Sequence, residues 1–343
     1  MSTFFIAEAG VNHNGSDELA LKLFEAAKHC GADAVKFQTF SADKLVRKGA
    51  EKADYQKLAT GEGDQYSMLK HLEMSAELHR KLIERCNELD IEFMSTPFDE
   101  EAADFLIELG MRHIKIPSGE ITNHPFLACL AAMNVPMILS SGMATLAEIQ
   151  EAIGVIRAVR QQHGFDAPLE GVLTVLHCTS NYPAAFDDVN LRAMTTIAQA
   201  TGLPVGYSDH TAGATVSIAA VALGASVIEK HFTLDRNLPG PDHKASLEPD
   251  ELADMITRIR DVERALGSPI KQPTASELPV RELVRRSVTL VRSVAAGKII
   301  TSEDVALMRP GNGIAPKDMV EVIGKCAAMD IEAGITLQWA YIK

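Results

Sequence analysis

The sequence has no excess of basic residues and no long apolar run. It holds 33 Lys and Arg against 46 Asp and Glu, a formal net charge of −13. Nucleic acids and anionic membranes are bound through basic patches, so we expect neither as a partner. The first residues lack the basic region and long apolar stretch of a secretory signal, and nothing approaches the length of a membrane span. We therefore expect a cytoplasmic protein.

Cysteine is also scarce. The five cysteines are widely scattered, with no C-x-x-C pair: Cys30, Cys86, Cys129, Cys178 and Cys326. We expect reduced thiols buried in the core.

Apolar residues are plentiful, at 46% of a chain of 343, which predicts a large packed core and about two domains. Between amphipathic helical patterns, short β-rich runs recur eight times: residues 4–10, 34–40, 91–98, 113–119, 136–142, 173–179, 203–209 and 226–232. Strict β-α alternation indicates parallel strands, and eight units fit a closed (β/α)8 (TIM) barrel better than an open sheet. We assign the barrel to residues 1–267.

The pattern changes after the barrel. Residues 268–279 contain prolines and are poor in helix signals, so we interpret 268–284 as a linker. Short strands and turns follow in 285–343, which we assign to a small β-rich domain. Within it, 293–301 and 330–338 share a frame of an apolar residue, any residue, Ala-Gly, two residues and another apolar residue. This weak repeat predicts two similar hairpin units.

Barrel enzymes carry their reacting groups at the C-terminal ends of the strands, and here those ends are polar. The residues concerned are Lys36, Gln38, Thr96, Lys115, Ser118, Glu120 and Ser140. A lysine inside an apolar barrel is costly unless an anion compensates it. Lys36 and Lys115 therefore favour a phosphate or carboxylate site. The alternative is that both lysines pair with internal carboxylates such as Glu8 and Glu120.

Two histidines end neighbouring strands of the predicted barrel. His210 follows the seventh strand and His231 ends the eighth, so both imidazoles can reach one metal ion. The alternative is a pair of hydrogen-bonded rim histidines. Two protein ligands would leave positions for water and substrate oxygens, which suits Mn²⁺ or Mg²⁺ better than structural zinc.

A set of motifs in order resembles the bacterial sialic acid synthase family. In the barrel these are AEAGVNHNG, KFQTF, STPFD, KIPSGE, LSSGM, LHCTSNYP, GYSDHT, IEKHFTLD and GPDHKASLEP. In the tail, RRS, MRPGNGI and IGKCA resemble the antifreeze-like (SAF, β-clip) domain of that family. The resemblance spans nearly the whole chain. It implies a metal-dependent, carbon–carbon bond-forming transferase that joins phosphoenolpyruvate to an N-acetylated amino sugar.

The resemblance also implies residue roles. His210 and His231 would bind the divalent metal, with Mn²⁺ preferred and Mg²⁺ or Co²⁺ possible. The residues that would hold phosphoenolpyruvate are Lys36, Thr96, Lys115, Ser118, Ser140 and Ser208. Those that would contact the sugar are Gln38, Glu120, Tyr182, Asp242 and Arg309, the last supplied by the partner subunit of a domain-swapped homodimer. Ser180 stands where some members carry Asn, which puts one phosphate contact in doubt.

The sugar and the proton-transfer group stay open at this point. Glu8 and Glu120 are the candidates to handle the attacking water, and we favour Glu120 because it adjoins the phosphate residues. We favour N-acetylmannosamine as substrate, giving N-acetylneuraminate. The alternative is legionaminate synthesis from 2,4-diacetamido-2,4,6-trideoxy-mannose, and specificity is expected to depend on residues 42–68. Rival functions are a Schiff-base aldolase using Lys36 or Lys115 and a non-catalytic carbohydrate-binding barrel.

Overall fold

The structure, a computed structural model, describes residues 2–343. It divides into two compact units, of which the first ends at Gly267 and the second begins at Ser268. In the part of the chain that is described, no helix combines the length and the apolar character needed to cross a membrane.

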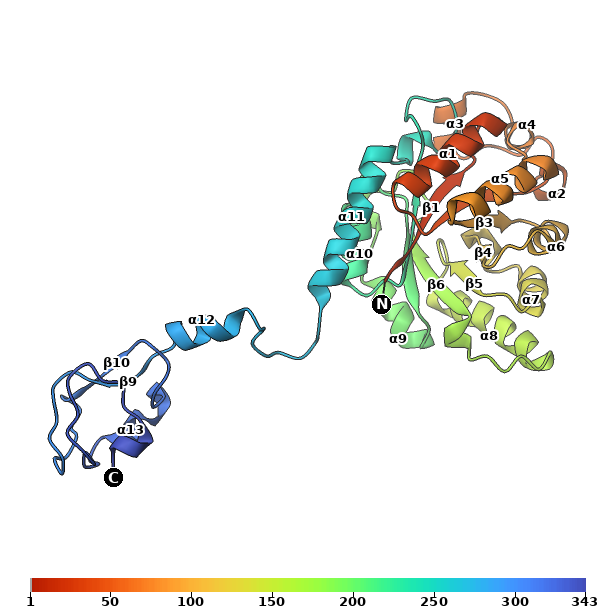
Figure 1. Cartoon of the computed structure of the whole chain (residues 1–343). Helices are drawn as coiled ribbons and strands as arrows, with labels where there is room; N and C mark the ends of the chain where they lie inside the picture. The colour runs from red at the N-terminus through yellow and green to blue at the C-terminus, as the bar shows by residue number, and fades with distance from the viewer. Residues whose placement is uncertain (1) are drawn as a thin grey trace. The chain divides into compact units, whose positions relative to one another are not determined.

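The first unit alternates strands and helices from end to end (Figure 1). Its strands are β1 Phe4–Gly10, β2 Ala34–Thr39, β3 Glu92–Pro97, β4 Ile114–Ile116, β5 Met137–Ser140, β6 Leu173–Cys178, β7 Val205–Asp209 and β8 Val227–His231. Its α-helices are α1 Asp17–His29, α2 Ala42–Leu45, α3 Asp54–Thr60, α4 Gln65–His71, α5 Ala76–Leu89, α6 Glu100–Glu108, α7 His124–Ala132, α8 Leu146–Gln162, α9 Ala193–Thr201, α10 Thr215–Ala222 and α11 Pro249–Leu266.

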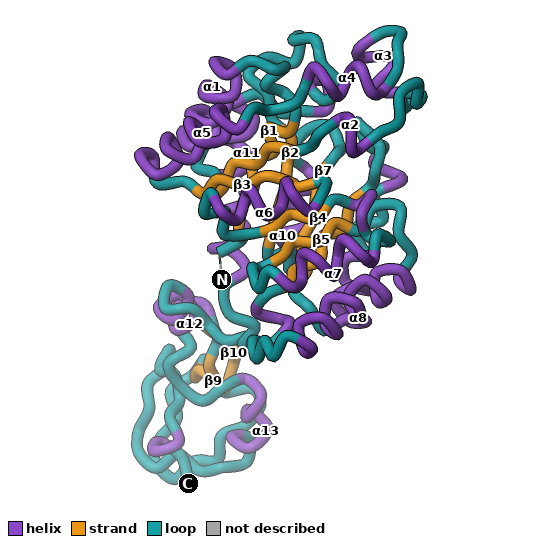
Figure 2. Tube along the Cα trace, turned by 90° about the vertical axis from the view of Figure 1, so that its right-hand side faces the viewer, coloured by secondary structure: helices purple, strands orange, loops and turns teal. Residues whose placement is uncertain are grey.

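The eight strands form one parallel sheet in the order β3-β2-β1-β8-β7-β6-β5-β4. β3 and β4, at the two ends of that order, also lie side by side, so the sheet curls into a near-barrel. Helices surround the strands (Figure 2). The predicted TIM-barrel class and all eight strands are confirmed. β4 is shorter than its predicted run because Pro117, which has no N–H to donate, follows it and leads into the 3₁₀ turn Ser118–Glu120.

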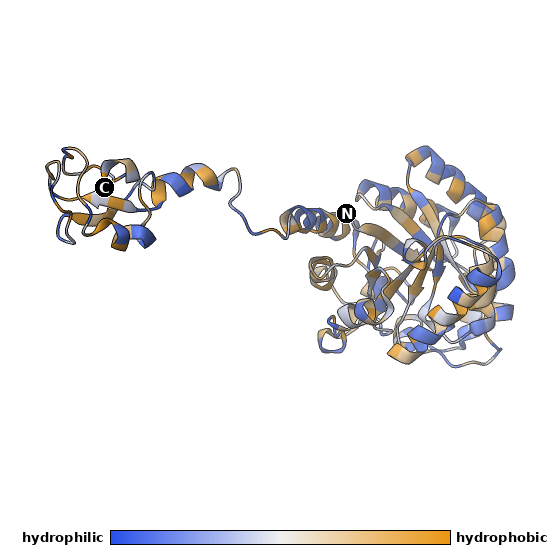
Figure 3. Cartoon of the chain, turned by 90° about the horizontal axis from the view of Figure 1, so that it is seen from below, coloured by the Kyte–Doolittle hydropathy of each residue, from blue (hydrophilic) through white to orange (hydrophobic). Residues whose placement is uncertain are grey.

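The outer helices bury one face against the sheet and leave the other polar (Figure 3). In α5, Leu78, Leu82 and Cys86 recur every four residues and are all buried. Ser75 caps that helix by accepting a hydrogen bond from the backbone N–H of Leu78. The apolar periodicity of the sequence thus becomes the packing of helices on strands.

Residues inside the barrel change character along the strands. An apolar layer fills the N-terminal part, made of Ile6, Ala34, Met94, Ile138, Leu176 and Val227. Because alternate residues of a strand face the same side, the next inward positions are Glu8, Lys36, Thr96, Ser140 and Glu229. The apolar layer therefore closes the barrel from below, and a polar layer lies at its C-terminal end.

The second unit has its own core. It contains α12 Glu277–Val284, β9 Ser287–Leu290, β10 Val305–Met308 and α13 Met319–Val322. β9 and β10 pair antiparallel. A separate cluster of buried apolar side chains surrounds them, including Val288, Leu290, Ile314 and Leu337.

The predicted repeat has a structural basis, but its pairing differs from the prediction. Gly297 and Gly334, at equivalent places in the two segments, both have positive φ, of 82° and 85°, which glycine adopts without strain. The segments do not form two separate hairpins, since Val294 of the first bridges Ile331 of the second in antiparallel fashion. The repeated Ala-Gly sequence produces a similar turn in each segment, and tertiary packing pairs the two segments with each other.

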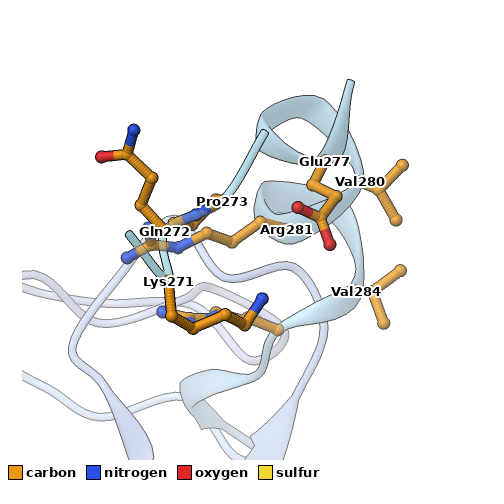
Figure 4. A pocket seen from close by; sticks show the side chains of 8 residues that line it. Lys271, Gln272, Pro273, Glu277, Val280, Arg281 and Val284 are labelled. Atoms are coloured by element: carbon orange, nitrogen blue, oxygen red, sulfur yellow. The ribbon is translucent and has the colours of Figure 1, made fainter. Parts of the chain in front are cut away.

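The end of the predicted linker is a helix. α12 begins at Glu277, inside the stretch expected to be poor in helix, because Thr274 hydrogen-bonds the Glu277 carboxylate and starts the turn. A hollow of about 490 Å³ lies beside it, lined by α12 and by Lys271, Gln272 and Pro273. Val280 and Val284 project from one side of the helix, whereas Arg281 extends on the other (Figure 4).

Candidate active site

The strand register places the key side chains at one level of the barrel. Glu8 on β1 lies opposite Lys36 of β2 and opposite His231 of β8. Ser208 of β7 lies opposite Glu229 of β8. These four strands are consecutive in the sheet, in the order β2-β1-β8-β7, so residues far apart in the sequence meet at the same rim.

These side chains line a cavity of about 500 Å³ at the C-terminal end of the barrel. Its lining includes Glu8, Lys36, Gln38, Thr96, Lys115, Ser118, Ser140, Ser180, Tyr182, Ser208, His210, Glu229 and His231. The polar residues singled out in the sequence are thus largely brought together in one place.

Both lysines pair with buried carboxylates. Lys36 Nζ lies 2.6 Å from Glu8 Oε2 and 3.5 Å from Glu229 Oε2, and Lys115 Nζ lies 3.4 Å from Glu229 Oε1. The alternative interpretation, that both lysines pair with internal carboxylates, is therefore correct for Glu8. The second carboxylate is Glu229 and not Glu120, which that interpretation had named. The cluster of two lysines and two glutamates carries compensating charges, all buried and all open to the cavity.

The two carboxyl groups differ in acidity. Burial raises the pKa of Glu8 to about 7, although Lys36 opposes the shift. Burial also acts on Glu229, but Lys115, Lys36 and the hydrogen bond from Ser208 outweigh it and lower its pKa to about 2. Burial lowers the pKa of Lys115, whereas Glu229 and Glu8 raise that of Lys36.

Hydroxyl groups surround the lysines. Lys36 donates to Thr96 Oγ1 at 3.0 Å, and Ser208 Oγ donates to Glu229 Oε1 at 2.8 Å. Ser118 Oγ accepts from the backbone N–H of Gly142 at 2.9 Å. Ser140 Oγ is buried without a hydrogen-bond partner, a costly arrangement that a ligand oxygen would relieve.

The histidine pair fits a divalent metal. The His210 and His231 rings lie 5.6 Å apart between centroids. His210 Nδ1 donates to the Thr179 carbonyl at 2.6 Å, which leaves Nε2 as an acceptor. His231 Nδ1 is buried and unpaired. Burial lowers the pKa of both residues, to about 4 for His210, so both rings are neutral as metal ligands must be.

Across residues 2–343, no group of three or more His, Cys, Asp or Glu side chains is arranged to hold a metal ion.

An aromatic wall covers one side of the cavity. The Tyr182 ring lies 4.1 Å from His210, 5.6 Å from His231 and 5.2 Å from Tyr55, all between ring centroids. Gln38 also lines the cavity and donates weakly to Glu8 Oε1 at 3.5 Å.

Three residues with implied sugar contacts do not line the cavity. Glu120 ends a 3₁₀ turn, and its carboxylate accepts from Asn123 Nδ2 at 2.7 Å. Asp242 is buried, which raises its pKa to about 6, and its charge contributes to raising the pKa of Tyr182 and of Tyr55. Arg309 belongs to the second unit. The preference for Glu120 over Glu8 therefore has no support from this placement, because the turn after β4 directs Glu120 toward Asn123.

Sequence reasoning missed Glu229. It lies two residues before His231 in SVIEKHF, and this spacing alone could have identified it, because strand residues two apart face the same side. It also named no individual residue of 42–68, yet Ala53, Tyr55, Gln56 and Gln65 line the cavity.

Comparisons with known proteins settle the family. A model described as the NeuB family matches residues 23–271, and one described as the SAF domain matches 285–343. The chain belongs to the NeuB family. It is 53% identical over 344 residues to the N,N'-diacetyllegionaminic acid synthase of Legionella pneumophila, covering 100% of this chain and 95% of that protein. The synthase of the same name from Campylobacter jejuni is 47% identical, covering 95% and 96%.

A solved structure agrees with the fold. The N-acetylneuraminic acid (sialic acid) synthetase of Leptospira borgpetersenii, in complex with citrate, superposes with a TM-score of 0.72 at 34% identity. The match covers 82% of this chain and 90% of that one. The resemblance to the sialic acid synthase family and the barrel-plus-SAF organisation are confirmed.

Proposed function

We propose that this protein is an N,N'-diacetyllegionaminic acid synthase, condensing phosphoenolpyruvate with 2,4-diacetamido-2,4,6-trideoxy-mannose. The observation that carries the choice of sugar is the 53% identity along the whole chain to a synthase of that name, against 34% to the synthetase named for N-acetylneuraminic acid. The comparisons favour this alternative over the N-acetylmannosamine that we preferred from sequence.

Phosphoenolpyruvate is assigned to the lysine side of the cavity. Lys36 and Lys115 supply buried positive charge, and Thr96, Ser118, Ser140 and Ser208 supply donors around them. An arriving phosphate would accept hydrogen bonds from these groups in a site of low dielectric constant, where charge-assisted hydrogen bonds are strongest. Glu8 and Glu229 keep the lysines compensated until the substrate binds.

His210 and His231 would hold a divalent metal ion, which when bound supplies a Lewis acid for the sugar's aldehyde. In the reaction, the double-bond electrons of phosphoenolpyruvate join its C3 to the aldehyde carbon, and the aldehyde oxygen takes up a proton. Water then adds to C2 and loses a proton, which leaves a hydroxyl and the phosphate on the same carbon. Phosphate leaves with the electrons of its C2–O bond, and the hydroxyl loses its proton to become the C2 carbonyl. We assign the acceptance of the water proton to Glu8, because it lines the cavity and burial raises its pKa to about 7, while the lysines would stabilise the departing phosphate.

The homodimer and the contribution of Arg309 from a partner subunit belong to the same proposal. In support, α12 exposes large apolar side chains, with Leu278, Val280 and Leu283 each more than half exposed.

Arg309→Ala is expected to raise the KM for the sugar and leave the KM for phosphoenolpyruvate unchanged. Light scattering on the purified protein should give twice the chain mass, and a monomer would contradict this part.

The deciding experiment is phosphate release from phosphoenolpyruvate with Mn²⁺, comparing the diacetamido sugar with N-acetylmannosamine, each with and without EDTA. We expect release mainly with the diacetamido sugar, abolished by EDTA. Preference for N-acetylmannosamine would restore our first choice, and release with neither would favour a non-catalytic carbohydrate-binding barrel. Lys115→Met serves as the inactive control.

A further inference from the structure

The segment that carries α2, α3 and α4, between β2 and α5, is called the inserted segment here. It forms part of the cavity lining and is additional to the regular alternation of barrel strands and helices. It carries three short helices, α2, α3 and α4, before the regular barrel helix α5. From it, Tyr55, Gln56 and Gln65 line the cavity. Long insertions in barrel loops are where this fold varies its chemistry, since the strands themselves are fixed by packing.

Tyr55 adds a second ring to the aromatic wall. Tyr182 contacts both histidine rings directly, whereas Tyr55 contacts Tyr182. A sugar whose aldehyde lies at the histidines would therefore place its later carbons beside Tyr55. The ring offers an apolar surface suited to an acetyl or deoxy methyl group.

Gln56 adds a polar group beside that ring. Its Oε1 accepts from the backbone N–H of Ala53 at 3.0 Å and so closes the first turn of α3. The Gln56 side chain also interacts with the Tyr55 hydroxyl, so the two groups lie together at the cavity. Gln65 lies at the first position of α4, which is held in place when its backbone N–H donates to the Ala50 carbonyl at 2.9 Å. Two carboxamides and an aromatic ring can match both the hydrogen-bonding groups and the methyl of an acetamido substituent.

We propose that Tyr55, Gln56 and Gln65 form a subsite that recognises the second acetamido group of the sugar, at carbon 4. This inference rests on the proposed function, because it assumes a sugar that carries that group. It assigns substrate choice to the inserted segment, whereas the lysines and histidines serve the reaction common to both sugars.

The test uses Gln56→Glu. A glutamate keeps the oxygen that accepts from Ala53 and so preserves the helix turn, but it replaces the amide donor with an acceptor. We expect the KM for the diacetamido sugar to rise about tenfold, as when a bound polar group loses its partner. The KM for phosphoenolpyruvate should be unchanged. Gln65→Glu should act in the same direction.

The matched control is Leu58→Ala, a change on the same helix at a side chain that is 83% exposed. It should leave both KM values unchanged. If wild-type protein releases phosphate with the diacetamido sugar and Gln56→Glu leaves its KM unaltered, the subsite is wrong and the proposed function stands. If wild-type protein does not use that sugar, the proposed function is wrong, and the subsite that rests on it is wrong as well.

Discussion

Glu8 and Glu229 share one buried cluster, but each carboxyl has a different set of neighbours. Glu229 lies between two lysines and accepts a hydrogen bond from Ser208, whereas Glu8 has its close contact with Lys36 alone. These neighbours lower the pKa of Glu229 and favour its anionic form. The anionic form of Glu8 has fewer stabilising neighbours. Glu8 accepts a weak hydrogen bond from Gln38 and lies opposite His231 of β8. At the residue scale, position within the cluster separates a structural carboxylate from one that can exchange protons.

Glu8→Gln is expected to lower kcat by about 100-fold or more, because a positioned acid–base group contributes on the order of 10² to 10⁴ in rate. Glu120→Gln, measured in parallel by phosphate release, is the comparison. A large loss in Glu120→Gln with Glu8→Gln near wild type would return the water-handling role to Glu120, as first expected.

The inserted segment depends on one buried lysine. Lys52 is 6% exposed, and its ammonium donates to Thr60 Oγ1 at 2.9 Å, to the Gly61 carbonyl at 3.1 Å and to the Glu62 carbonyl at 3.4 Å. These acceptors lie at and just after the C-terminal end of α3, where carbonyls lack helix partners and a cation is favourable. At the element scale, we expect these hydrogen bonds of Lys52 to fix α3 and so to keep Tyr55 and Gln56 at the cavity.

Lys52→Met should loosen this segment without unfolding the barrel. We expect faster backbone amide exchange confined to residues 49–68, together with a higher KM for the sugar. Lys57→Met is the matched control, because Lys57 lies on α3 in an exposed ion pair with Glu51 at 3.6 Å. Equal exchange in the two variants would show that Lys52 does not hold the segment.

At the scale of the whole molecule, buried histidines make the fold sensitive to acid. His13 and His243 are fully buried, and burial lowers the pKa of each from 6.5 to about 4. Between these values the unfolded chain binds protons that the folded chain does not. The stability from these groups is therefore complete above about pH 6.5 and is lost as the pH falls toward 4.

His13→Asn should reduce this sensitivity. The asparagine oxygen can replace His13 Nδ1 as acceptor for the Gly15 backbone N–H, now 3.1 Å away, but it does not titrate. Between pH 7 and pH 5, the free energy of unfolding of the wild type should fall by about 2 kcal/mol more than that of the variant. Urea unfolding at the two pH values measures the difference, and parallel losses would contradict it.

The sequence by itself determined the barrel and much of its polar rim. Strand residues alternate between two environments, so Lys36 and Gln38 had to share a face, and the β-α alternation had to give parallel strands whose ends meet. Only the tertiary structure decided which carboxylates compensate the lysines and that Tyr55 lies against Tyr182. Periodicity fixes the direction of a side chain within a strand, but the path of an inserted segment and the partner of a buried charge depend on packing between elements distant in the sequence.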